Sequence, residues 1–345
     1  MNIAPIAYLF PSLYVMSDRG IRQALEQGRL IVDPLTDDQI QPASLDVRIG
    51  QVRVYDHEAM AKAAEQLSRM PPAAAVNYEP TTEFAKTYPD EDDIPIDIPP
   101  GTFAEVFFHE KIQHDSAITL QVDLRSSRGR LGLQLTSTYL EHDAQGTYVS
   151  LWNWNPNTIR LYGRTKFAQL FIHTNEPSDG VVCCDEYLPF HLGDHVYKFR
   201  QIGILDTKQK TPDEVLYEKL STESVTIRKH EPTIVQLLPE VKIPANFGLK
   251  ILHKIPYCQN PGHMRPDPEM MGLETMCANA GWVDPGYEGK ITGHPMRTKF
   301  PVTLKKGDFI ALGVVFAYAQ SVLRPYGRSD LGSHYQKSDG TTSKS

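Results

Sequence analysis

After Pro100 the sequence breaks into short segments in which apolar and polar residues alternate, and this pattern limits the fold most strongly. The first six segments read TFAEVFFHEKIQ, ITLQVDLR, LGLQLTSTY, TYVSLWNW, NTIRLYG and KFAQLFIH. β-Branched and aromatic residues alternate with polar ones, and turn signals recur about every ten residues, which is typical of β-sandwiches and β-barrels. We therefore predict a fold dominated by β-strands.

Two stretches before Pro100 favour short helices instead. Residues 17–28 begin with a candidate N-cap serine, carry an apolar face and end on a glycine that can adopt the left-handed conformation. Residues 56–70, DHEAMAKAAEQLSRM, are rich in Ala, Glu and Lys. Residues 71–100 then become Pro-rich and acidic, and this composition predicts a surface excursion rather than a core element.

The second half of the chain echoes the first. TFAEVFFHEKI at 102–112 resembles TIVQLLPEVKI at 233–243, and TIRLYG at 158–163 resembles VTLKKG at 302–307. The offsets of about 130 to 145 residues match the length of one β-domain. Two unrelated β-domains can share such a rhythm, but a tandem duplication explains the echoes better. We predict domains at 1–204 and 205–345, with a linker near 201–212.

Composition restricts the class of protein. The 345 residues are 41% apolar and carry a formal net charge of -7, which argues against a nucleic-acid-coating surface. The longest apolar run, 309–319, is too short to cross a bilayer, and the N-terminus lacks the basic region of a signal peptide. The four cysteines, two of them adjacent, do not form a disulfide scaffold. We expect a soluble cytoplasmic protein with neither a nucleic-acid nor a membrane partner.

The stretch DLRSSRGRLGL at 123–133 concentrates cations and hydroxyls in this acidic protein. Arg125, Ser126, Ser127 and Arg130 would place guanidinium and hydroxyl donors on one side of a turn. Such donors match the oxygens of a phosphate group. A solvated strand end has the same composition, so the residues alone leave both interpretations open.

A second motif, IQPASLDVRIG at 40–50, alternates strictly from Ser44 onward. Its apolar positions are Leu45, Val47 and Ile49, and its polar positions include Asp46 and Arg48. By itself this pattern indicates an ordinary half-buried strand with an ion pair on its surface.

A third motif, ANAGWVDPGYEGKI at 278–291, predicts a β-hairpin with Asp284 at its tip and Tyr287 close by. A carboxylate there can accept a hydrogen bond from a sugar hydroxyl, the aromatic ring can pack on the sugar, and exposed main chain can read a base. A plain turn would explain the Gly and Pro residues but not the whole string.

The last stretch, RPYGRSDLGSHYQKSDGTTSKS at 324–345, is polar, basic and rich in Gly and Ser. Its composition predicts a disordered tail. The functional alternative is a lid that becomes ordered over phosphates.

Together the four motifs resemble those of the dCTP deaminase/dUTPase superfamily, and the tail looks like that of dCTP deaminases. The resemblance implies jelly-roll β-barrels, usually in trimers with active sites between subunits. Here RSSRGR lies in the first half, whereas DPGYEG and the tail lie in the second half. This distribution resembles the double-length dCTP deaminases, so we expect two tandem dUTPase-like jelly-roll barrels that complement each other. A homo-oligomer, for example a trimer of tandem chains, is the implied assembly.

The resemblance also implies roles for individual residues. Ser126 and Arg130, with Arg125 and Ser127, would hold the triphosphate and the attacking water. Asp284 and Tyr287 would hold the deoxyribose, while main chain around Gly286 would read the pyrimidine. The residues implied to close on the phosphates are Tyr335, Gln336 and Lys337. Mg²⁺ would be bound through the nucleotide triphosphate, with no protein side chain as a metal ligand.

One feature of the family is missing. Its deaminases use a glutamate on the strand after the Asp-Pro-Gly motif, but that position holds His294 in the second half and Ser150 or Leu151 in the first. A histidine can act as a base near neutral pH, so His294 is the catalytic candidate beside Ser126 and Arg130. Other carboxylates are near in sequence, although alignment does not favour them: Glu141, Asp143 and Glu288.

Three functions remain open at this stage. The first is hydrolytic deamination of dCTP to dUTP and ammonia; the second is dUTPase-like release of pyrophosphate; the third is a pyrimidine-nucleotide-binding regulator without activity. Zinc-dependent deamination is not expected, because it needs H-x-E and P-C-x-x-C motifs that this chain lacks. The loosely spaced His253, Cys258 and His263 are more often an incidental grouping than a metal site.

Overall fold

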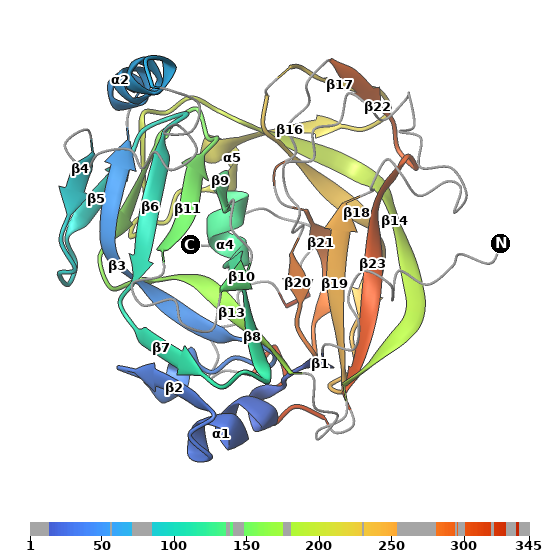
Figure 1. The fold of residues 1–345 in the computed structure, drawn as a ribbon. Coiled ribbons are helices and arrows are strands. Elements are labelled where there is room, and N and C mark those ends of the chain that lie inside the picture. Colours follow the sequence, from blue (N-terminus) through green and yellow to red (C-terminus); the bar gives the residue numbers. More distant parts are fainter. Residues whose placement is uncertain are drawn as a thin grey trace.

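A computed structural model describes most of the chain. The described residues are 14–55, 57–70, 85–135, 139–140, 148–174, 181–229, 231–253, 281–293, 295, 301–318, 321–328 and 336–337. Figure 1 shows two β-sheets side by side, one built largely from the N-terminal half of the chain and one from the C-terminal half. No helix in the described ranges is both long enough and apolar enough to span a membrane.

The first sheet has the strand order β10-β8-β13-β3-β6-β11-β9, with β1 beside β13 and β4 beside β3. Its strands are β1 (Tyr14–Val15), β3 (Leu45–Tyr55), β4 (Lys86–Tyr88), β6 (Phe103–Phe108), β8 (Ile118–Leu124), β9 (Leu133–Leu135), β10 (Tyr139–Leu140), β11 (Tyr148–Asn153) and β13 (Lys166–Thr174). Two small sheets accompany it. They are β2 (Leu30–Asp33) with β7 (Lys111–His114), and β5 (Pro95–Ile98) with β12 (Thr158–Tyr162) and β15 (Ile204–Asp206).

The second sheet has the order β20-β19-β23-β14-β18-β21, with β16 beside β14. Its strands are β14 (Val181–Phe199), β16 (Tyr217–Ser221), β18 (Thr233–Lys242), β19 (Phe247–His253), β20 (Trp282–Val283), β21 (Glu288–Thr292) and β23 (Phe309–Tyr318). A separate pair joins β17 (Val225–Ile227) to β22 (Val302–Leu304).

The two sheets repeat one topology. Read in the same direction, β10, β8, β13, β3, β6 and β11 correspond in order to β20, β19, β23, β14, β18 and β21. The echo between residues 102–112 and 233–243 falls on the equivalent strands β6 and β18. The prediction of a β-dominated fold with two barrel-like halves is therefore confirmed, and the repeat seen in the sequence has a counterpart in strand order.

Helices are few and short, as expected. They are α1 (Asp18–Glu26), the 3-10 helix η2 (Asp37–Gln39), α2 (His57–Ser68), α4 (Ser126–Arg130) and α5 (Asp213–Leu216). The helices predicted at 17–28 and 56–70 are confirmed by α1 and α2. Gly28 adopts a φ of 70° after α1, whereas Ser17 at the N-cap makes no capping hydrogen bond with its side chain.

Two expectations about irregular segments were wrong. Residues 95–98 do not lie in a surface excursion: they form β5, and Ile96 and Ile98 are completely buried. The alternation in IPIDI was hidden by Pro95 within it and by the two prolines that follow; an edge strand tolerates such a proline. The expected linker at 201–212 contains β15, which pairs in parallel with β12 of the first half. The predicted boundary between residues 204 and 205 therefore falls inside β15, which pairs with a strand of the first half.

A small hydrophobic cluster joins the two sheets. It packs Val15, Ala43 and Phe171 of the first half against Trp282 and Tyr318 of the second. The ring centroids of Phe171 and Trp282 lie 5.0 Å apart. Because these side chains are all buried, they form an apolar contact between the halves next to the 282–287 region. The larger core of the first half also includes Tyr197, Tyr217 and Ile234 of the second.

Candidate nucleotide site

The candidate site is a cavity between the two halves, where α4 faces β20 and β21 (Figure 1). The empty space within it, including open solvent at its mouth, amounts to about 480 Å³. The lining residues are Ser126, Arg130, Ile251, Gly281, Trp282, Val283, Asp284, Tyr287, Ile291, Thr292 and Tyr326. Two predicted residues of the first half, Ser126 and Arg130, thus meet two of the second half, Asp284 and Tyr287.

The RSSRGR motif forms the short helix α4 rather than a simple turn. The main-chain N–H of Arg125 donates to the carbonyl of Phe167 at 3.1 Å, which fixes the start of α4 to β13. Arg130 is buried, and its Nη2 donates to the carbonyl of Thr292 at 3.4 Å. The carbonyl of Arg130 accepts a hydrogen bond from the Tyr217 hydroxyl at 3.0 Å. The guanidinium therefore lies at the junction of the halves, with its charge on the cavity wall.

The second-half motif forms a turn over Asp284–Tyr287, but it is not the predicted hairpin. β20 pairs with β19 and β21 pairs with β18, so the two flanking strands are the opposite ends of the second sheet. The turn itself is closed by the N–H of Tyr287 donating to the carbonyl of Asp284 at 3.1 Å. Local sequence predicted the turn correctly, but strand pairing depends on distant partners. We call residues 284–287 the closing turn.

Asp284 is the ionisable carboxyl of the described cavity wall. Burial, and after it the Asp46 carboxylate, raise the pKa of Asp284 to about 7, although the Arg125 guanidinium acts to lower it. Its side chain makes no hydrogen bond within the described residues. A carboxyl group with such a pKa can donate or accept a proton near neutral pH.

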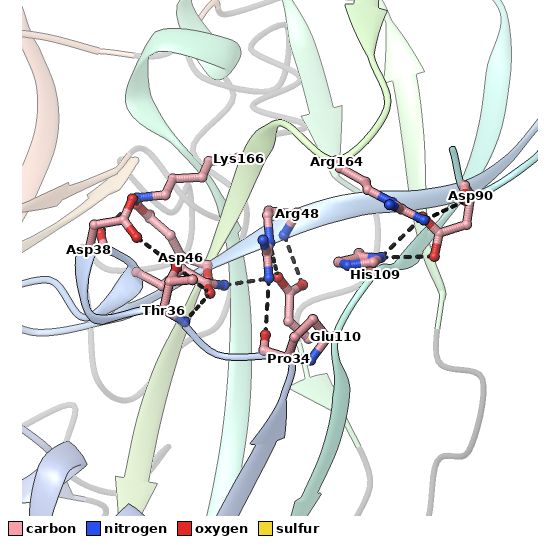
Figure 2. A network of polar contacts seen from close by, with 11 residues as sticks. Pro34, Thr36, Asp38, Asp46, Arg48, Asp90, His109, Glu110, Arg164 and Lys166 are labelled. Carbon is pink, nitrogen blue, oxygen red and sulfur yellow. Dashed lines mark hydrogen bonds and ion pairs between the residues drawn. The ribbon is translucent and has the colours of Figure 1, made fainter. Parts of the chain in front are cut away.

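Asp46 was not predicted as a functional residue, and the interpretation of its strand needs correction. Ser44 and Asp46 are only 1% exposed, so the polar face of β3 is covered rather than solvated. Asp46 Oδ1 lies 3.6 Å from Arg125 Nε. Arg48 pairs with Glu110 at 2.6 Å instead (Figure 2). Burial raises the pKa of Asp46, and Arg125 and then Lys166 lower it. Alternation showed which face Asp46 occupies, but not what covers that face.

Two of the predicted tail residues, Gln336 and Lys337, bond to the main chain at and just after the closing turn. Gln336 Nε2 donates to the carbonyl of Gly286 at 3.1 Å, and Gln336 Oε1 accepts from the N–H of Glu288 at 3.2 Å. The N–H of Lys337 donates to the carbonyl of Glu288 at 2.7 Å. Neither Gln336 nor Lys337 lines the described cavity. Tyr335 lies outside the described residues.

The main-chain carbonyl and N–H of Gly286 both form hydrogen bonds within the protein. Besides accepting from Gln336, Gly286 donates its N–H to the carbonyl of Ile243 at 3.0 Å. Tyr326, which the sequence analysis did not single out individually, lines the cavity next to it. The N–H of Tyr326 donates to the carbonyl of Pro285 at 2.7 Å, and its ring lies 5.7 Å from that of Tyr287.

The remaining candidates are placed as follows. Ser127 does not line the cavity, and neither does Glu288, which pairs with Lys242 at 3.1 Å. Leu151 is fully buried in the first core, with Ser150 on the other face of β11. Within the described ranges, no group of three or more His, Cys, Asp or Glu side chains could hold a metal ion. His294, Glu141, Asp143, Cys258 and His263 lie outside the described residues.

The first half of the chain is similar in sequence to known dCTP deaminases. A family model described as dCTP deaminase-like matches residues 15–175. A protein named "dCTP deaminase, dUMP-forming" from Bifidobacterium animalis subsp. lactis is 31% identical over 171 residues, which cover 48% of this chain and 82% of that protein. This chain belongs to the dCTP deaminase-like family. A family member of the same name from Methanosphaera stadtmanae is 27% identical over 171 residues, again covering 48% of this chain and 82% of the relative.

The family match in the sequence covers the first half, whereas a structural match covers both. The crystal structure of 2'-deoxycytidine 5'-triphosphate deaminase from Agrobacterium tumefaciens superposes with a TM-score of 0.66 and 14% sequence identity. The superposition covers 90% of this chain and 99% of that chain. At this identity the likeness concerns the fold alone, and it extends the fold of a dCTP deaminase to the second half.

Proposed function

We propose that the protein deaminates dCTP, converting dCTP and water into dUTP and ammonia. The observation that carries this proposal is the single cavity in which Ser126 and Arg130 of one half face Asp284 and Tyr287 of the other. Arg130 is suited to phosphate oxygens, and Asp284 with the two tyrosines is suited to a sugar. Membership of the dCTP deaminase-like family supports the same reaction.

In this reaction water adds to C4 of the cytosine ring, and the exocyclic amine leaves as ammonia. A base must take a proton from the water, and the same group can return it to the leaving amine. His294 is the proposed base, because it occupies the position of the family glutamate. Ser126 would orient the water, and Arg130 would hold phosphate oxygens.

Mg²⁺ fits this proposal as an ion held by the substrate. The described cavity wall carries one carboxyl group, Asp284, whereas Mg²⁺ prefers several oxygen ligands. The phosphates would supply those ligands, and the bound ion would offset their charge beside Arg130.

A second candidate is deamination coupled to release of pyrophosphate, with dUMP as the product. The names of the two relatives described above specify this outcome for those proteins. A pyrimidine-nucleotide-binding regulator without activity is the remaining alternative.

One set of incubations separates the candidates. The protein is incubated with dCTP and, separately, with dUTP in the presence of Mg²⁺, and ammonia and pyrophosphate are measured. Ammonia with dUTP as product supports the first candidate, ammonia with pyrophosphate and dUMP supports the second, and pyrophosphate from dUTP alone supports a dUTPase. Nucleotide binding without either product would leave only the regulator. His294→Ala at the wild-type rate of deamination would remove His294 from the mechanism.

A further inference from the structure

The segment Ser321–Arg328 connects the second sheet to the cavity by way of the first half of the chain. Its main chain is held by Asp18, the first residue of α1, which is completely buried. Asp18 Oδ1 accepts from the N–H of Leu323 and Asp18 Oδ2 accepts from the N–H of Arg324, both at 2.9 Å. Hydrogen bonds to an ionised carboxylate are stronger than those between neutral groups. One carboxylate therefore fixes two consecutive residues that lie more than 300 positions away.

The side chain of Arg324 makes a second attachment to the first half. Its guanidinium bonds to the carboxylate and the carbonyl of Asp37, both at 3.2 Å, and to the carbonyl of Ile40. The Arg324 side chain is only 12% exposed, whereas that of Asp37 is 68% exposed, so Arg324 is the buried partner and Asp37 the solvent-facing one. We call Asp18 and Arg324 the tail anchor.

Two residues beyond the tail anchor, the same segment becomes a wall of the cavity. Tyr326 lines the cavity, bonds to Pro285 through its N–H and packs its ring on Tyr287. Gly286 approaches this segment so closely that a Cβ there would lie 2.8 Å from Pro325. The segment is thus attached to α1 and η2 at one end and to the closing turn at the other.

We propose that the tail anchor is a positioning device for nucleotide binding, in which Asp18 and Arg324 hold Tyr326 against the closing turn. Neither residue lines the cavity, so both act through the segment rather than on the ligand. This proposal rests on the proposed function, because the ligand is taken to be a pyrimidine nucleotide. It gives a role to the SDRG stretch at the start of α1, which sequence analysis interpreted only as a helix start.

The test compares Asp18→Asn with Asp115→Asn. Both variants change a carboxylate to an amide in the first half, but Asp115 pairs with Arg29, and within the described residues no hydrogen bond or ion pair joins it to 321–328. Asp18→Asn loses one acceptor and the charge, so we expect KM for dCTP to rise about tenfold while kcat stays within about twofold. Trypsin should also cleave after Arg328 faster in nucleotide-free Asp18→Asn than in the wild-type protein. Asp115→Asn should change neither measurement.

If Asp18→Asn does not fold, Arg324→Gln serves as the second variant. We expect it to show the same rise in KM and the same faster cleavage by trypsin. Wild-type KM and cleavage in both tail-anchor variants would overturn the proposal, as would equal changes in Asp115→Asn. If the wild-type protein binds no nucleotide, the proposed function fails. The cleavage rates then still decide whether Asp18 and Arg324 hold the segment.

Discussion

At the scale of single residues, Asp284 is a carboxyl group whose charge depends on pH near neutrality. Its pKa rises from an ordinary 3.8 to about 7 in the folded protein, first because of burial. The folded state therefore holds a proton that the unfolded state has lost between these two values. This contribution to stability is complete below about pH 4 and is lost as the pH rises through 7.

Asp284→Asn should remove this pH dependence. Relative to the wild-type protein, its free energy of unfolding should be higher at pH 8 than at pH 5, by on the order of 2 kcal/mol, which means that the variant is relatively more stable at pH 8. Denaturant unfolding at the two pH values measures the difference. An equal difference in the free energy of unfolding between variant and wild type at pH 5 and at pH 8 would mean that Asp284 titrates near its ordinary pKa.

Arg130 should matter through the shape of its guanidinium as well as its charge. Arg130→Lys keeps the charge but loses the planar fork that matches phosphate oxygens, so we expect kcat/KM for dCTP to fall by about tenfold or more. Arg128→Lys, on the same helix but outside the cavity, is the matched control and should stay near the wild-type value. Equal losses in the two variants would point to damage to α4 rather than to a lost phosphate contact.

At the scale of elements, the closing turn depends on a glycine for two separate reasons. Gly286 has a φ of 92°, and a Cβ at this position would lie 2.8 Å from Pro325 and 3.0 Å from Tyr326. Gly307 has a similar φ of 89°, but nothing lies within 4 Å of its Cβ position. The pair therefore separates backbone strain from crowding.

We expect Gly307→Ala to lower the free energy of unfolding by about 1 kcal/mol from strain alone. Gly286→Ala should cost roughly 1 to 3 kcal/mol more, because Pro325 and Tyr326 must move, and it should also weaken nucleotide binding. Thermal or denaturant unfolding together with nucleotide titration measures both effects. Equal costs for the two variants would show that the segment beside the closing turn moves freely.

At the scale of the whole molecule, a buried ion pair connects the sheets. Lys250 Nζ on β19 lies 3.1 Å from Asp123 Oδ2 on β8, and both residues are at least nine-tenths buried. Burial raises the pKa of Asp123, while Lys250 lowers it. Asp123 lies two residues before Arg125, so the assembly of the halves and the candidate site share this strand.

Removing one partner should be far more costly than removing both. Lys250→Met leaves a buried carboxyl group unpaired and should lower the free energy of unfolding by about 3 to 5 kcal/mol, more at pH 8 than at pH 5. The double variant Lys250→Met/Asp123→Leu should recover much of this loss. Lys242→Met removes the partner of Glu288 at a lysine that is 80% exposed, and should cost less than about 1 kcal/mol. If Lys250→Met also cost less than about 1 kcal/mol, the Asp123 carboxyl group would not be left buried and unpaired as expected.

Local sequence was enough to predict most strands of the first half after Pro100, the helices α1 and α2, the repeat and the turn at Asp284. These features depend on alternation, turn residues and spacing, which are properties of neighbouring positions. Motif order was enough to bring Ser126 and Arg130 together with Asp284 and Tyr287 in one predicted site. The structure places all four around one cavity.

Other features required the tertiary structure, because they depend on what lies beside a residue in space. Pro95 and the two prolines after IPIDI concealed a strand whose isoleucines are buried in the core. Asp46 is buried next to Arg125 because other elements pack over its strand, which the local sequence does not show. Likewise, β20 and β21 pair with different neighbours, so the turn between them closes a sheet instead of a hairpin. Asp18 reaches Leu323 across a separation of 305 residues, and no local pattern records such a contact.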